Sequence, residues 1–195
     1  NKVYDGTTTA TATLTLSGLV GSETLGQSVG ATFADQNVNT GIVVTVNSIT
    51  LSDGDNGGVA SNYSISTGQA TTANITAKTL TATASASNKV YDGTTTATAT
   101  LTLSGLVGAE TLGQSVGATF ADKNVANAKT VTVNSITLSD GDSGGLASNY
   151  SISTGQTTTA NITAKALTIA GITASNKTYN GNTTATIDAS AATFT

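Results

Sequence analysis

The chain has 195 residues, 7 lysines, no arginine and 11 acidic residues, giving a formal net charge of -4, and it contains no His, Cys, Pro, Met or Trp. The missing His and Cys exclude a Ser-His-Asp triad, a cysteine nucleophile, a disulfide and an imidazole or thiolate metal site. With charged residues at 9% and no arginine, no basic surface for nucleic acid is expected, and no apolar run is long enough for membrane insertion within this segment. The 42 threonines, with valine in strands and glycine in turns, favour an all-β protein.

Two long sequence repeats dominate the chain. Residues 1–80 match residues 88–167 at 69 of 80 positions without a gap, and five of the eleven differences cluster at 39–43. A third, weaker copy begins at Asn176. The period of 87 residues is longer than the 20 to 50 typical of solenoid coils, so each repeat is expected to be one domain. The predicted domains are 1–78 (first repeat, without the start of its first strand), 79–165 (complete second repeat) and 166–195 (truncated start of a third), in a window cut from a longer polypeptide.

Alternation of apolar and polar side chains predicts the strands within each repeat. In the first repeat the alternating runs are 10–17, 29–34, 44–51, 63–67 and 73–77, and a further run, 80–84, leads into the second. The run 44–51 changes phase, which predicts a β-bulge near Asn47 and Ser48. Short strands about ten residues apart, separated by Gly, Asn and Asp, predict an Ig-like β-sandwich. A tandem array of such domains would form an extended rod.

The connection between the repeats is short. Residues 77–80 contain neither glycine nor proline and leave almost no spare length between the domains. Such a connection is expected to restrict bending, unlike a flexible Gly/Ser linker.

Five segments occur in an order that resembles a known family. They are KVYDGTTTAT at the start of the repeat, ATFADKNV at 118–125, TVTVNSITLS at 130–139, SNYSIS at 148–153 and TANITAKALT at 159–168. The chain resembles the YDG/MBG-type β-sandwich repeats of large, filamentous-haemagglutinin-like bacterial adhesins. The resemblance implies a cell-surface or secreted protein, exported by two-partner secretion, with roles in cell adhesion and biofilm formation. It supplies no ligand for the repeat itself, and the loop 52–63 departs from the family by being longer.

The motif Tyr-Asp-Gly occurs once in each full repeat. Glycine suits the positive φ of a tight turn, aspartate bonds its own backbone in such turns, and tyrosine covers the edge of a small core. A structural turn is therefore favoured over a binding motif. The residues concerned are Tyr4, Asp5 and Gly6, and again Tyr91, Asp92 and Gly93.

Closely spaced aspartates suggest calcium as an alternative role for one loop. Alternate carboxylates can converge on a hard cation, but Gly57 and Ser64 occupy positions that carry oxygen ligands in an EF-hand loop. A flexible Gly-rich loop is favoured, and no other metal or cofactor is expected. The candidate ligands are Asp53 and Asp55, with Asp140 and Asp142 in the second repeat.

Two covalent modifications remain open from the sequence. A Lys–Asn crosslink would need a buried lysine, an asparagine and a carboxylate, for example Lys2 or Lys78 with Asn74 and Glu23. Glycosylation would need exposed sequons, of which there are six: Asn62, Asn74, Asn149, Asn161, Asn176 and Asn182.

The composition favours a structural role over catalysis. The chain has only two glutamates, and its 5 tyrosines and 3 phenylalanines are too few for a sugar-stacking platform, so an enzyme is not expected. The favoured function is a stalk or spacer in a surface adhesin, with neighbouring repeats as partners. The alternative is that the repeats themselves bind polysaccharide or associate with other copies into a filament or matrix.

Overall fold

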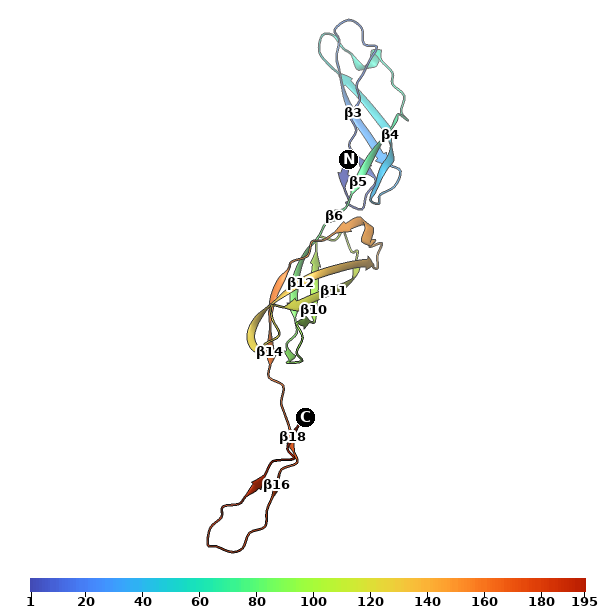
Figure 1. The fold of residues 1–195 in the computed structure, drawn as a ribbon. Coiled ribbons are helices and arrows are strands. Elements are labelled where there is room, and N and C mark those ends of the chain that lie inside the picture. Colours follow the sequence, from blue (N-terminus) through green and yellow to red (C-terminus); the bar gives the residue numbers. More distant parts are fainter.

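The computed structural model describes residues 1–195 as an elongated all-β molecule, in which the second repeat follows the first end to end (Figure 1). The only helices are two short 3-10 turns, η1 (Ala60–Asn62) and η2 (Ala147–Asn149). Neither turn has the length or apolar character of a membrane span. The all-β class predicted from composition and alternation is confirmed.

The first repeat is built on one five-stranded sheet with the order β1-β5-β4-β3-β2. Strands β3 and β4 form a long antiparallel hairpin, and β1 runs parallel to β5. The register shifts where Gly30 pairs with Ser48 but Ala31 pairs with Val46, so Asn47 is the bulged residue, and the predicted bulge is confirmed. The strands are β1 (Lys2–Val3), β2 (Thr9–Ala10), β3 (Leu25–Phe33), β4 (Asn39–Asp53) and β5 (Ala70–Thr76).

The second repeat has an equivalent sheet, with the order β8-β14-β12-β11-β9, and additional strands. An antiparallel ribbon of β7 and β10 covers the core, with the alanines of β7 packed against it. A short parallel pairing joins β6 to β13. The strands are β6 (Lys78–Thr79), β7 (Thr81–Ala86), β8 (Lys89–Val90), β9 (Thr96–Ala97), β10 (Ala99–Ser104), β11 (Leu112–Phe120), β12 (Ala126–Asp140), β13 (Tyr150–Ser151) and β14 (Thr157–Thr163).

Two strands predicted for the first repeat do not form. Residues 12–17 have the same sequence as β10, yet only β2 appears in the predicted run 10–17. Residues 63–67 likewise form no strand. In the second repeat β10 pairs with β7, and β13 pairs with β6. No segment takes the places of β6 and β7 in the first repeat, and a strand without a partner has no ladder to join.

Residues after β14 extend beyond the second repeat (Figure 1). Two short antiparallel pairings join β15 (Ile169–Ala170) to β18 (Thr193–Phe194) and β16 (Thr173–Ala174) to β17 (Ile187–Asp188). No residue of this part belongs to either buried core, and Tyr179 is 92% exposed. The third copy therefore has strand pairing without a hydrophobic core.

The cluster of sequence differences changes one core position. Ile42 is buried in the first repeat, whereas the corresponding residue in the second is Lys129. The Lys129 side chain is 9% exposed, and its Nζ lies 2.5 Å from Oδ1 of Asp122. The hydrogen bond from Lys129 lowers the pKa of Asp122. The second repeat thus carries a paired lysine where the first has isoleucine.

Replacing this lysine by the residue of the first repeat is expected to stabilise the second repeat. Lys129→Ile removes a largely buried charge whose partner Asp122 is 54% exposed, so little attraction is lost. We expect the free energy of unfolding of the second repeat to rise by about 1 to 2 kcal/mol in urea titrations. Ile42→Lys is the reverse control and should destabilise the first repeat. A loss of stability in Lys129→Ile would contradict this account.

Candidate functional site: the inter-repeat junction

The connection between the repeats is itself part of the second repeat. Only Ala77 separates the end of β5 from the start of β6, and β6 pairs with β13. Leu80, which directly follows β6, donates its backbone N–H to the carbonyl of Ser151 at 2.7 Å and is 2% exposed. The chain therefore passes from one repeat to the next without a free linker.

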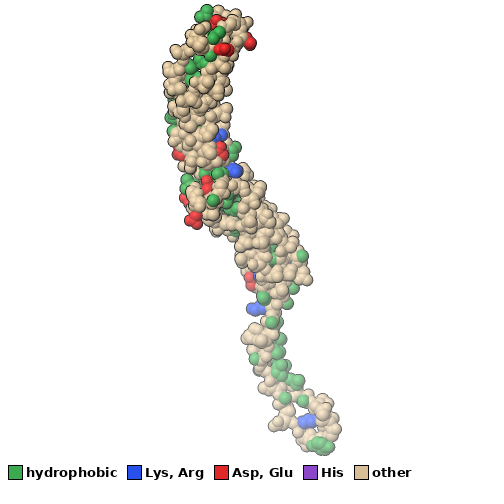
Figure 2. All heavy atoms as spheres, turned by 180° about the vertical axis from the view of Figure 1, so that it is seen from behind, with side chains coloured by type: hydrophobic (Ala, Val, Ile, Leu, Met, Phe, Trp, Pro, Cys, Tyr) green, Lys and Arg blue, Asp and Glu red, His purple; other side chains and the backbone are tan.

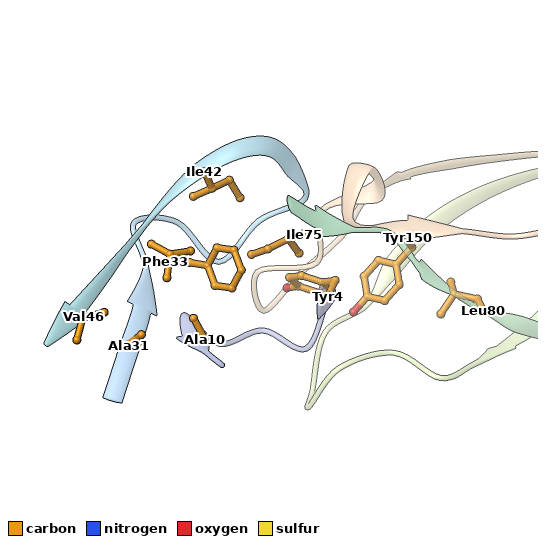
Figure 3. Packing of buried hydrophobic residues seen from close by; sticks show 10 residues of the cluster. Tyr4, Ala10, Ala31, Phe33, Ile42, Val46, Ile75, Leu80 and Tyr150 are labelled. Atoms are coloured by element: carbon orange, nitrogen blue, oxygen red, sulfur yellow. The ribbon is translucent and has the colours of Figure 1, made fainter. Parts of the chain in front are cut away.

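Two tyrosines from different repeats meet at the centre of the junction. Tyr4 and Tyr150 are 2% and 6% exposed, and their rings pack edge to face with centroids 5.4 Å apart (Figure 3). Both belong to one cluster of ten buried residues that extends from Phe33 in the first repeat to Leu80 in the second (Figure 3). The hydrophobic core of the first repeat is thus continuous across the boundary.

Glu110 holds both tyrosines through its two carboxylate oxygens. The Tyr4 hydroxyl donates to Oε1 at 2.6 Å, and the Tyr150 hydroxyl donates to Oε2 at 2.6 Å. The Tyr150 hydroxyl also accepts the backbone N–H of Val107 at 2.9 Å. Burial, reinforced by the hydrogen bond to Glu110, raises the pKa of Tyr4 to about 12, and the same two causes raise the pKa of Tyr150.

The raised tyrosine pKa values predict that the junction loosens in alkali. A pKa above the ordinary tyrosine value of 10.0 means that the folded state holds the proton more tightly than the unfolded chain does. The stability that this contributes is fully present below pH 10.0 and is lost as the pH rises towards about 12. Unfolding followed by circular dichroism between pH 10.0 and about 12 should show this loss of stability. In Tyr4→Phe the dependence of stability on pH should be smaller. An unchanged pH profile in Tyr4→Phe would contradict the assignment.

Asn149 forms a second contact between the repeats. Its side chain is completely buried; Oδ1 accepts the backbone N–H of Val38 at 2.9 Å, and Nδ2 donates to Oδ1 of Asn37 at 2.9 Å. The corresponding Asn62 of the first repeat is exposed. The same residue is therefore a buried connector in one repeat and a surface side chain in the other.

Asn149→Ala is expected to weaken the junction by about 1 to 3 kcal/mol, because the partly buried N–H of Val38 would lose its partner. Urea unfolding of the full chain measures the loss. The matched control is Asn62→Ala, which removes the same atoms from an exposed position and should leave stability within about 0.5 kcal/mol of the parent. Equal losses from both variants would refute the role of Asn149.

The Tyr-Asp-Gly turn contacts the next repeat through its glycine. Gly6 has φ +74°, and a Cβ added there would lie 2.8 Å from Cγ1 of Val107. Oδ1 of Asp5 accepts the backbone N–H of Thr7 at 2.9 Å, as a turn aspartate does. Gly93 has the same backbone, with φ +80°, but a Cβ there would meet nothing within 4 Å. The motif forms a turn in both repeats and packs against a neighbour only in the first.

Three apolar junction residues have counterparts in the other repeat or in the third copy, and these counterparts are exposed because no neighbouring repeat covers them. Val20, the counterpart of Val107, is 68% exposed, and Val125, the counterpart of Val38, is 51% exposed. Leu167 is 68% exposed, in contrast to the buried Leu80. Each repeat therefore carries the apolar parts of a junction at both of its ends.

The other candidate residues are held in different arrangements. Oδ1 of Asp53 accepts the backbone N–H of Ala60 at 2.7 Å, and Asp140 makes the equivalent bond to Ala147 at 2.8 Å. No group of three or more His, Cys, Asp or Glu side chains is placed to hold a metal ion, so no third acidic ligand joins either aspartate pair, Asp53 with Asp55 or Asp140 with Asp142. Charged side chains are sparse over the face in Figure 2.

The proposed crosslinking residues bond to other partners. Nζ of Lys2 lies 2.6 Å from Asp5, the Asn74 side chain accepts the N–H of Gly41 at 2.9 Å, and Glu23 accepts the Tyr63 hydroxyl. The structure does not bring Lys2, Asn74 and Glu23 together. Among the sequons, Asn62, Asn176 and Asn182 are exposed, Asn74 and Asn161 are half-buried, and Asn149 is buried.

The sequence does not indicate a role in the junction for Glu110, Tyr150 or Asn149. Of these three, only Asn149 belongs to a modification motif, a sequon. The available signal is that the two glutamates of the chain, Glu23 and Glu110, occupy the same position in the two repeats. Only the structure shows that one of them bonds to the preceding repeat.

The comparison with family models matches the YDG domain over residues 1–73 and 76–160. No curated protein and no solved structure matches the chain with significance. The break between the two matches, at residues 74–75, lies in the last part of β5, shortly before Ala77, which separates β5 from β6. The matched segments together cover most of the chain, which therefore belongs to the YDG domain family.

Proposed function

We propose that these YDG repeats are structural spacer units of a large bacterial adhesin, at the cell surface or secreted. In this role they project a distal binding region from the cell and support adhesion or biofilm formation. The repeats work by setting length and direction, and they carry out no catalysis. Export by two-partner secretion is part of the same proposal and follows from the resemblance to filamentous-haemagglutinin-like repeats.

The observation that carries the proposal is the buried junction. The core continues through Tyr4 and Tyr150, Glu110 bonds to both of them, and Asn149 accepts the backbone N–H of Val38. Domains that are joined by flexible linkers are expected to move relative to one another unless a large hydrophobic interface holds them together. Here the connection is paired as β6, so neighbouring repeats resist bending.

The test is how the length of the molecule grows with the number of repeats. Small-angle scattering of the full chain and of a chain with both full repeats duplicated gives the largest dimension of each. With stiff junctions the largest dimension should rise by the full length of the two added repeats, whereas the part formed by repeats on flexible junctions grows only by about 1.4-fold, the square root of two. Growth near the lower value would overturn the spacer proposal. Saturable binding of polysaccharide by the same chain would favour the alternative, in which the repeats are the adhesive surface.

A further inference from the structure

The structure contains two cavities, and both lie in the first repeat. The larger is an open cleft of about 530 Å³ whose apolar lining is Ala10, Ala12, Phe33, Val44 and Ala73. The smaller, of about 310 Å³, has an apolar lining of four leucines with Tyr63 and Ile65, beside the polar Thr15, Ser17, Ser64 and Gln69. Residues 12–17 link the two cavities, because Ala12 lines the larger and Leu16 lines the smaller.

In the second repeat this path is occupied by the chain that enters it. Strand β7 pairs with β10 over six residues, from Ala86 opposite Ala99 to Thr81 opposite Ser104. Ala82, Ala84 and Ala86 pack against the buried core beneath. The larger cavity therefore corresponds to the space that the end of β7 fills.

The smaller cavity corresponds to the place of Leu80. Leu80 is buried in a cluster against which six partly buried side chains of the second repeat pack: Leu103, Leu106, Val107, Leu112, Leu138 and Ile152. Apart from that of Val107, their counterparts 87 residues earlier line the smaller cavity: Leu16, Leu19, Leu25, Leu51 and Ile65. The first repeat thus has an unfilled cavity at the place that Leu80 occupies in the second repeat.

Backbone groups along the same path lack backbone partners, although the carbonyl of Leu14 accepts a hydrogen bond from Nε2 of Gln27 at 2.6 Å. Residues 12–17 make no backbone–backbone hydrogen bond, although the identical residues 99–104 form β10. The uncovered core is also more accessible: Leu14 is half-buried, whereas Leu101 is 6% exposed. Unpaired strand groups beside open apolar surface form an edge that can accept another strand.

We propose that the two cavities and residues 12–17 form one strand-acceptor groove, which binds the exit segment of another YDG repeat. The exit segment is the part that follows the last strand of the sheet, as Lys78–Ala86 follows β5. Its leucine enters the smaller cavity, its alanines cover the larger, and its backbone completes the ladder with 12–17. This deepens the proposed spacer role by naming the segment that joins a repeat to the one before it.

The test adds a synthetic exit segment to the full chain. The probe is a peptide of residues 77–87 with blocked ends, titrated by isothermal calorimetry and followed by amide hydrogen exchange. We expect saturable binding of one peptide per chain and new protection at residues 12–17. Residues 99–104 are the internal control, because β7 already pairs with them. Binding without new protection at 12–17 would overturn the proposal, as would no binding.

A matched peptide tests the leucine cavity. The peptide carrying Leu80→Asp keeps the backbone and the alanines but places a charge in an apolar site, so its affinity should fall at least about tenfold. Equal affinity of both peptides would show that the smaller cavity is not used and would overturn the assignment. The outcome is independent of the scattering test, because peptide binding reports the groove and scattering reports the stiffness of the junction.

Discussion

Replacing Tyr4 by alanine is expected to lower the free energy of unfolding of the first repeat by about 3 to 5 kcal/mol. The ring is 2% exposed and packs against Tyr150, and its hydroxyl bonds to Glu110. Removing it opens a cavity in the cluster that spans both repeats and leaves one carboxylate oxygen without its donor. Urea unfolding of the full chain, followed by circular dichroism, measures the loss.

Tyr91→Ala is the matched control, because Tyr91 occupies the same position of the second repeat without a neighbouring repeat against it. Tyr91 is half-buried and lies outside the ten-residue cluster. Its replacement should cost clearly less than that of Tyr4. Tyr4→Phe separates the ring from the hydroxyl and should cost about 1 to 2 kcal/mol. Equal losses from Tyr4→Ala and Tyr91→Ala would mean that the contact between repeats contributes nothing.

Glu110→Gln is expected to loosen the angle between the repeats while both remain folded. The substitution keeps the size of the side chain but removes the charge that accepts both tyrosine hydroxyls at 2.6 Å. Hydrogen bonds to charged groups contribute about 1.5 to 3 kcal/mol, and a neutral amide retains part of this. The main effect should therefore be a wider range of inter-repeat orientations, with a modest loss of stability.

The absence of cysteine makes this measurable with two introduced labels. Spin labels at Thr50→Cys and Thr137→Cys, exposed positions that correspond in the two repeats, report the inter-repeat distance. The parent should give one narrow distribution and Glu110→Gln a broader one. Glu23→Gln is the matched control: Glu23 bonds to Tyr63 within its own repeat, so the distribution should stay narrow. A narrow distribution in Glu110→Gln would contradict the role of this carboxylate.

The local features of the fold could be predicted from the sequence because they depend on near neighbours in the chain. Alternation located β3, β4 and β5, and the phase change at Asn47 located the bulge. The contacts that form the junction are not local: Tyr4 and Glu110 are 106 positions apart, and Val38 and Asn149 are 111 apart. No periodic pattern indicates which side chains will meet across such distances.

Segments of identical sequence adopt different structures in the two repeats. The residues of β10 recur at 12–17, where they form no strand, and Asn149 recurs as the exposed Asn62. By itself, the sequence determined that the chain is all-β, repeated, turn-rich and without His or Cys. Only the tertiary structure decided which copy is paired and buried, because pairing and burial require a partner. Strands β6 and β7 pair with the second repeat alone, and Asn37 and Val38 of the first repeat bond to the buried Asn149.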